Sequence, residues 1–534
     1  MISVSDNWKL AQRQLLVPES YIKIDYLITD PDVQSDITVN VTDEAYYSNS
    51  ASIVNELDKP VDYITTIEDG LFLLDGNENY LNEELEYTKI GYVSNSIGDD
   101  TGIFPTPIVI ELQCSRVHTN IISGLTLTWA SVYNEFPVHY SVEIINGNTI
   151  IHSEDITDNK EVNNILNFEY SNFDKIRITI YSWCLPNKRA RIDEIIVGIY
   201  KTWTKKDLLS YTHTSSCDIL SGSLPKNEIT FDLDNSNLIW DMQNLTGNEK
   251  YLIEKQELKV KYGYDINGSI EWINVGKFYL HEWKTPANGI KVTFTARDLL
   301  TFMNDVYTGI TTGTLYAICE SALTQAELPS NSNGSVKWVL SDQLKEYTTT
   351  IPNDKTYTIA EILQLCSNAG MCVMYQDHDG IIRIEPQYLR LEDYVIDSFN
   401  SYEYPEFTTS RDLKAVNVNN NLGYIAVNDK GDIQTLNNAL IQTPEHANDV
   451  AQWVANNLKF RHTISGNIRL DPRLEVTDLI SVESRFNSLY AMAVTKVKET
   501  YNGAFRGEYE GRMYEFKPIE AGYLNDGTVS GDLW

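Results

Sequence analysis

Tight-turn signals between short strand patterns restrict the fold of this chain more than any other feature. Asn-Gly stands at residues 146–147 and 267–268, and Asp-Gly at residues 379–380, each between two short runs rich in apolar residues. These dipeptides supply the positive φ angles that two-residue hairpin loops require. The sequence therefore predicts a protein built mainly from antiparallel strands.

Strand patterns fill four main parts of the chain. A first strand, in which polar and apolar residues alternate, covers residues 20–28, and a dense series of strands with turn residues between them runs from about 36 to 203. Regular spacing of this kind, with almost no helical periodicity, predicts a β-sandwich. Further strands are predicted over residues 206–305 and from residue 466 to about residue 516, where the strand patterns end.

Helical periodicity occurs in three places only. Apolar residues at helical spacing predict helices over 315–323, over 358–370 and over 443–458. The second helix opens on Thr358 and Glu361, the spacing of a capping box, in which each side chain accepts a hydrogen bond from the other residue's backbone N–H. The fold class expected is mainly β with a smaller α+β part.

The formal net charge of -33 excludes several classes of partner. Between residues 50 and 110, Lys59 and Lys89 are the only basic side chains against twelve carboxylates. Such a surface repels nucleic acid and anionic membranes, so specific DNA binding is not expected. Solvated acidic surface is the simpler interpretation; an acidic conduit past which DNA slides without sticking is the functional one.

The six cysteines are too few and too scattered for a disulfide framework, and no Cys-x-x-Cys pair exists. Cys319 and Cys366 lie in apolar helical patterns and are expected to be buried free thiols. The chain begins without the basic and apolar regions of a secretory signal, and no apolar run reaches the roughly 20 residues that span a bilayer. Synthesis in a reducing cytoplasm and no membrane span are expected.

A search for catalytic motifs finds none that is complete. His281-Glu282 begins like a zinc-protease motif, but Thr285 stands where the second histidine is needed. No nucleophile elbow or phosphate loop has the required spacing. We therefore expect no enzymatic activity, no cofactor and no metal site.

One group of side chains has the composition of a binding site. Aromatic rings beside arginines suit sugar rings, which stack on flat apolar faces. The candidate residues for contact with a glycan or a partner are Trp129, Tyr133, Tyr140, Trp183, Arg189 and Arg191, with Tyr181 close in sequence. The alternative is that Trp129 and Trp183 belong to the sandwich core, as large aromatic residues usually do.

Five sequence segments are similar to segments of a known protein family. They are residues 221–235, 276–283, 292–300, 470–480 and 500–507. Together they resemble tail-hub proteins of bacteriophages and prophages of Gram-positive hosts, over roughly residues 206–515. The region 36–203 resembles a discoidin-type or jelly-roll sandwich.

The resemblance implies two tail-tube-like β-barrels joined by an α/β insertion and assembled as a trimer, whose six barrels match a sixfold tail tube. The expected segments are a hub strand in 1–35, an inserted sandwich in 36–205, barrel I in 206–312, the α/β insertion in 313–425, and barrel II with a polar tail in 426–534. Many such hubs carry a C-terminal peptidase or muramidase module, which this sequence lacks, so wall-degrading activity is not carried over.

The resemblance further implies a virion protein at the tail tip or baseplate. Its expected partners are copies of itself, the tail tube or distal tail protein, other baseplate proteins and the tape measure protein, while DNA passes without specific binding. One alternative is an adhesin that binds a host surface glycan through the sandwich. An enzyme acting on wall polymer is a further alternative.

Overall fold

The computed structural model describes residues 1–514, apart from 15–18, 47, 55–90, 132, 242, 245–248, 267, 288, 327, 329–335 and 388–390. Most carboxylates of the acidic stretch between residues 50 and 110 fall in the gap at 55–90 and so lie outside the described residues. The polar tail after residue 514 lies outside them as well.

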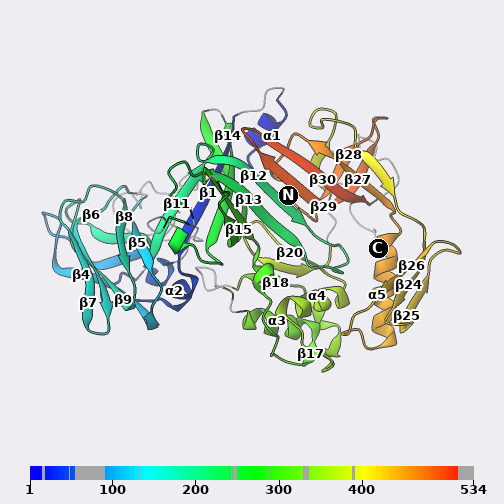
Figure 1. Cartoon of the computed structure of the whole chain (residues 1–534), viewed down its shortest axis with the longest axis horizontal. Coiled ribbons are helices and arrows are strands. Elements are labelled where there is room, and N and C mark those ends of the chain that lie inside the picture. The colour runs from blue at the N-terminus through cyan, green and yellow to red at the C-terminus, as the bar shows by residue number, and fades with distance from the viewer. Residues whose placement is uncertain are drawn as a thin grey trace, which may run out of the picture.

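The protein is mainly β, and one continuous sheet of 13 strands forms its centre (Figure 1). Its order is β11 (Gly198–Thr204), β1 (Ser20–Thr29), β14 (Glu257–Ile266), β15 (Ser269–Lys284), β16 (Lys291–Arg297), β13 (Lys226–Asp234), β12 (Leu208–Ser216), β29 (Leu489–Tyr501), β30 (Phe505–Met513), β27 (His462–Ile468) and β23 (Glu406–Thr409). Off this path, β28 (Leu479–Glu483) pairs with β29, and β22 (Leu391–Ile396) pairs with β28.

Two cores lie against this sheet. The first, on the strands from β11 to β12, is rich in aromatic rings, with Phe231 and Phe294 stacked at 5.4 Å and Trp203 at 5.5 Å from Phe294. Alternate residues of β16 are buried, as expected for a strand with one face on a core. The second core, on β27 to β30, gathers aliphatic residues such as Ile480 and Met492. We call these halves of the sheet the first and second modules.

The β-sandwich stands to one side of the large sheet (Figure 1). One layer has the order β3 (Tyr92–Ile97), β10 (Arg189–Ile196), β5 (Ile122–Trp129) and β8 (Asn163–Tyr170). The other has the order β2 (Thr38–Val41), β4 (Ile103–His118), β9 (Phe173–Trp183), β6 (Pro137–Asn146) and β7 (Thr149–Ile156). The residues between the layers form one separate core, and Gly147, with φ +57°, turns the β6–β7 hairpin as predicted.

The sandwich enters and leaves the large sheet at one place. The chain leaves β1 through the short helix α2 (Pro31–Asp36) and returns in β11, which pairs antiparallel with β1. Thr29 and Gly198 are partners in this register. The 36–205 segment expected for the sandwich thus includes β11, a strand whose hydrogen bonds lie in the large sheet.

A helical unit packs below the sheet (Figure 1). It contains three helices, α3 (Leu315–Gln325), α4 (Ile359–Ala369) and α5 (Pro444–Leu458). It also contains three small sheets: β17 (Thr312–Thr314) with β19 (Thr348–Thr350); β18 (Trp338–Leu340), β21 (Ile382–Glu385) and β20 (Val373–Gln376) in that order; and β25 (Gly423–Ala426), β24 (Leu413–Val418) and β26 (Asp432–Leu436) in that order. The three predicted helices are confirmed, including the Thr358–Glu361 capping box. The boundary expected between the 313–425 and 426–534 segments falls inside this unit, because α5 shares a hydrophobic core with α3 and α4.

Helix α1 (Asp6–Gln12) was not predicted from the sequence; it begins at Ser5, whose side chain accepts a hydrogen bond from the Trp8 N–H. All six cysteines are free thiols, and Cys319 and Cys366 are fully buried as predicted. Within the described residues, no helix combines the length and apolar character needed to cross a membrane.

Candidate functional site

The structural centre of the molecule is the junction at which the two modules become one sheet. Strand β12 of the first module pairs antiparallel with the second half of β29. The first half of β29 pairs instead with β28 of the second module. One strand therefore belongs to both modules, and its backbone hydrogen bonds hold them side by side.

A buried polar network lies in this junction. His213 on β12 faces Glu499 on β29 in the strand register, and their side chains meet with Nδ1 2.9 Å from Oε2. His213 Nε2 lies 2.7 Å from Asn227 Oδ1 on β13. The Tyr262 hydroxyl on β14 donates to Glu499 Oε2 at 2.7 Å. The network thus joins side chains of four strands from both modules.

Burial and the charge of Glu499 act together on the pKa values of this network. Glu499 is 2% exposed and His213 is 7% exposed. Burial opposes the charged imidazolium, but the hydrogen bond and negative charge of Glu499 outweigh it, so the pKa of His213 is raised. The pKa of Tyr262 is raised well above its ordinary value by burial and then by Glu499. Glu499 thus favours the protonated form of both partners, each of which lies within hydrogen-bond distance of its Oε2.

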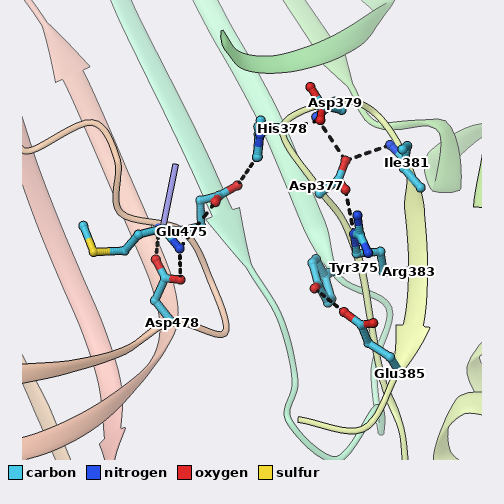
Figure 2. Close-up of polar contacts among 10 residues, drawn as sticks. Tyr375, Asp377, His378, Asp379, Ile381, Arg383, Glu385, Glu475 and Asp478 are labelled. Atoms are coloured by element: carbon cyan, nitrogen blue, oxygen red, sulfur yellow. Dashed lines mark hydrogen bonds and ion pairs between the residues drawn. The ribbon is translucent and has the colours of Figure 1, made fainter. Parts of the chain in front are cut away.

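A second polar cluster lies beside the junction, where the β20–β21 hairpin meets the loop before β28 (Figure 2). His378 Nδ1 in the hairpin lies 2.8 Å from Glu475 Oε1 in the loop. Glu475 also faces the amino group of Met1 at 3.8 Å, and that group bonds Asp478. A pocket of about 200 Å³ opens between these segments and reaches His213 and Glu499.

The hairpin that carries His378 is held rigid from within. One Asp377 oxygen accepts the backbone N–H of Asp379 at 3.0 Å and of Ile381 at 2.9 Å, while the other accepts from Arg383 Nε at 2.6 Å (Figure 2). Gly380, with φ +79°, closes the turn predicted by the Asp-Gly pair. The hydrogen bond to Glu475 raises the pKa of His378 to about 9. At neutral pH, therefore, His378 is a cation that binds the helical unit to the second module.

The residues of the predicted aromatic site do not form one surface. Trp129, Tyr140 and Trp183 are buried in the sandwich core, with at most 2% exposure. Trp129 donates from Nε1 to Asn164 Oδ1 at 2.6 Å, and Trp183 donates from Nε1 to Glu135 Oε2 at 2.8 Å. These three side chains therefore pack the two layers of the sandwich together.

The other predicted residues are half-buried. The Arg191 guanidinium lies over the Tyr133 ring, 4.7 Å from its centroid. Arg189 donates to the backbone carbonyl of Ser94 at 3.1 Å and to that of Asn95, so it ties β10 to β3. Tyr181 packs against His139 with centroids 4.4 Å apart. Of the predicted set, the structure thus brings Tyr133 and Arg191 together at the surface of the sandwich.

The junction residues were not found by sequence reasoning. His213 and Glu499 are 286 residues apart, and His378 and Glu475 are 97 residues apart. Neither pair has a motif spacing, because strand pairing in space brings each one together. The sequence showed no more than a histidine in the strand-rich segment 206–305 and a glutamate in the strand-rich segment after 466.

Comparison with known proteins gives fold-level similarity only. No protein-family model and no curated protein matches the chain. Among solved structures, it is similar to a 43 kDa tail protein of prophage MuSo2 from Shewanella oneidensis, at 12% identity and TM-score 0.41, over 58% of this chain and 94% of that one. It is also similar to a tail protein from Neisseria meningitidis MC58, at 10% identity and TM-score 0.40, over 59% and 93%. A third is the prophage tail protein gp18 from Listeria monocytogenes EGD-e, at 11% identity and TM-score 0.37, over 59% and 91%.

Proposed function

We propose that this chain is a structural hub of a phage tail, placed at the tail tip or baseplate. The observation that supports this most is the fusion of two β-modules through β12 and β29 into one sheet. A chain that offers two side-by-side modules provides six of them in a ring of three copies. The sequence segments between residues 206 and 515 that resemble tail-hub proteins lie largely in these modules and support the same function.

In this proposal the mechanism is geometric. Three copies close a ring through one repeated heterologous contact and match a sixfold tube above with a threefold assembly below. The modules are then the two barrels of the hub, the helical unit joins them, and the acidic surface allows DNA to pass. The partners are the tail tube or distal tail protein, the tape measure protein and other baseplate proteins.

Electron microscopy of purified tails tests this proposal. The protein should lie on the tail axis at the distal end of the tube, in a threefold ring, and labelling of the sandwich should place it outside that ring. Density for the chain away from the tail axis would contradict the hub assignment. The mass of the purified chain in solution, measured with and without tail tube protein, distinguishes a preformed trimer from one that assembles on the tube.

A second candidate function is glycan contact by the sandwich, and the Tyr133–Arg191 pair favours it. An aromatic ring with a guanidinium beside it offers a stacking face and hydrogen-bond donors to a sugar. Loss of glycan-array or host-wall binding in Tyr133→Ala and Arg191→Ala would support the adhesin function. Lys160→Ala, which removes an exposed cation elsewhere on the sandwich, is the control. No binding by the folded, full-length protein would reject it.

A further inference from the structure

Three side chains with metal-binding atoms lie together where the chain passes from the large sheet into the sandwich. Asp36 is the last residue of helix α2, and Cys114 and His118 lie near the end of β4. One ligand atom from each, an oxygen, the thiol sulfur and an imidazole nitrogen, all lie within 4.8 Å of one another. The sequence did not reveal this group, because 82 residues separate Asp36 from His118.

The backbone directs these side chains to one point. The register of β4 on β9 shifts between Gln113 and His118, and after this irregularity His118 is again buried, like Cys114. The two residues are 4% and 5% exposed. Asp36 approaches from α2 and is fixed there, because its Oδ2 accepts the backbone N–H of Ser115 at 3.0 Å.

The imidazole and the carboxylate already face each other. His118 Nε2 lies 2.9 Å from Asp36 Oδ2. The rings of His118 and Phe173 lie 6.1 Å apart, so an aromatic residue borders the group on the sandwich side. Asp36, whose side chain is 16% exposed, is the member nearest to solvent and so gives an ion a route to the buried thiol.

We propose that Asp36, Cys114 and His118 form a binding site for a zinc-class transition-metal ion. Thiolate and imidazole select soft or borderline ions such as Zn²⁺ and Co²⁺ over Mg²⁺ and Ca²⁺, which prefer oxygen ligands only. Zinc binds sulfur at about 2.3 Å and nitrogen or carboxylate oxygen at about 2.0–2.2 Å. Ligand atoms within 4.8 Å of one another reach such distances by small side-chain movements.

Binding of the metal ion releases one proton from the site. The Cys114 S–H bond breaks, the proton passes to solvent, and a sulfur–metal bond forms, while Asp36 binds as the carboxylate. His118 binds as the neutral imidazole through one ring nitrogen and keeps its single N–H proton on the other. If the metal takes Nε2, which now faces Asp36, the Nε2 proton moves through solvent to Nδ1, with no net change in protons. Without a metal ion the thiol is protonated, since burial and then the charges of Asp36 and Asp174 raise the pKa of Cys114 to about 12. A water molecule completes four-coordinate geometry.

Bound metal would clamp the sandwich to its point of attachment. Helix α2 is the segment that follows β1, and its contacts with β4 and the turn after it are polar: Asn120 donates to Asp30 at 2.7 Å, and Arg116 lies 3.4 Å from Asp32. At the end of the same helix, bonds from a metal ion to Asp36, Cys114 and His118 would add to the hydrogen bonds that Asp36 already makes with Ser115 and His118. The site would therefore tie the end of helix α2 more firmly to β4, close to the point where the chain enters the sandwich.

Cobalt titration of the full-length, chelator-treated protein tests the site. We expect one Co²⁺ per chain, a tetrahedral visible spectrum, a thiolate-to-cobalt charge-transfer band, and displacement of Co²⁺ by Zn²⁺. Cys114→Ser and His118→Gln should each weaken binding by about 100-fold or more, since even outer-shell changes cost about 10–100-fold. The melting temperature should rise with Zn²⁺ in the wild type and not in these variants.

Two matched controls separate this site from general thiol or histidine effects. Cys184→Ser changes another cysteine of the same sandwich, and His139→Gln breaks a similar histidine–aspartate contact of 2.8 Å that has no cysteine in its group. Both should retain the cobalt spectrum. A wild-type protein that binds no cobalt, or binds it without the thiolate band, overturns the proposal, as does a Cys114→Ser variant with an unchanged spectrum. The wild-type spectrum decides by itself if a variant does not fold.

Discussion

Single buried ionisable residues make the stability of this protein depend on pH. His378 forms its contact with Glu475 as a cation, and Asp298 is held as a carboxyl group in a buried position at the start of a short 3₁₀ turn. In both cases the pKa of the folded state is raised. Such groups stabilise the folded state below their unfolded pKa, and this contribution is lost as the pH rises through the folded value.

The His378→Gln variant should change the pH dependence of stability between about 6.5 and about 9, the unfolded and folded pKa values of His378. In the wild type, the His378–Glu475 contribution is complete below this window and disappears above it. The variant should be less stable than the wild type at the acidic end and equal to it at the alkaline end. Urea unfolding at both ends measures this; an equal loss at the two ends would contradict it.

The Asp298→Asn variant should behave in the opposite way. Asp298 is 1% exposed, and burial raises its pKa to about 7. The wild type therefore loses stability as the pH rises from about 4 through about 7, because the carboxyl must ionise in the core. Asparagine can keep the hydrogen bond to the Thr301 N–H without a charge, so the variant should be the more stable protein above pH 7. A variant less stable at all pH values would disprove this.

At the scale of elements, the β12–β29 pairing is what makes two modules into one unit. Its backbone bonds are supplemented by the His213–Glu499 contact and by Tyr501 and Phe505, which pack into the aromatic core of the first module. The Phe505 ring lies 4.4 Å from the Tyr262 ring. The modules are thus held by shared core as well as by a shared strand.

Removal of the Glu499 carboxylate should therefore be costly. Glu499→Ala removes the buried acceptor that His213 Nδ1 and the Tyr262 hydroxyl share, and breaking a buried ion pair costs about 3–5 kcal/mol. Lys498→Ala on the same strand is the matched control, because its contact with Glu508 is solvent-exposed and such pairs contribute at most about 1 kcal/mol. Equal losses of unfolding free energy in the two variants, measured by chemical denaturation, would show that the network does not hold the junction.

Local patterns were sufficient to predict some elements. The Asp-Gly hairpin at Gly380 and the capping box at Thr358 are encoded within a few residues, and the structure has both. Helix α1 was missed because its seven residues are too few to establish a period. The site could not be predicted in the same way, since Trp129 in the core and Tyr133 near the surface have the same local sequence character.

At the scale of the whole molecule, the sandwich is an insertion whose two ends are neighbours. Thr29 and Gly198 are register partners, so the chain leaves the large sheet and returns to it at one point. The sandwich has its own core, and its other contacts with the first module include the exposed Glu169–Lys250 pair at 2.7 Å. The large sheet therefore does not need the sandwich for its own hydrogen bonds.

Replacement of residues 30–197 by Asn-Gly should leave the large sheet and the helical unit folded. The dipeptide would join β1 and β11 as a two-residue hairpin in their existing register. We expect a cooperative unfolding transition and retained β-sheet circular dichroism. The control deletion of residues 30–204 also removes β11 and uncovers β1, so it should aggregate or melt at a lower temperature. Equal behaviour of the two deletions would contradict the insertion.

The divided pairing of β29 also decides how this protein responds to force. A force along the strand loads all the backbone hydrogen bonds between β12 and β29 at once, in shear. A force across the strand breaks the same hydrogen bonds one after another, starting from one end. The molecule is accordingly stiff in the one direction and yielding in the other. A pull along β29 should therefore need a larger force to separate the two modules than a pull across it.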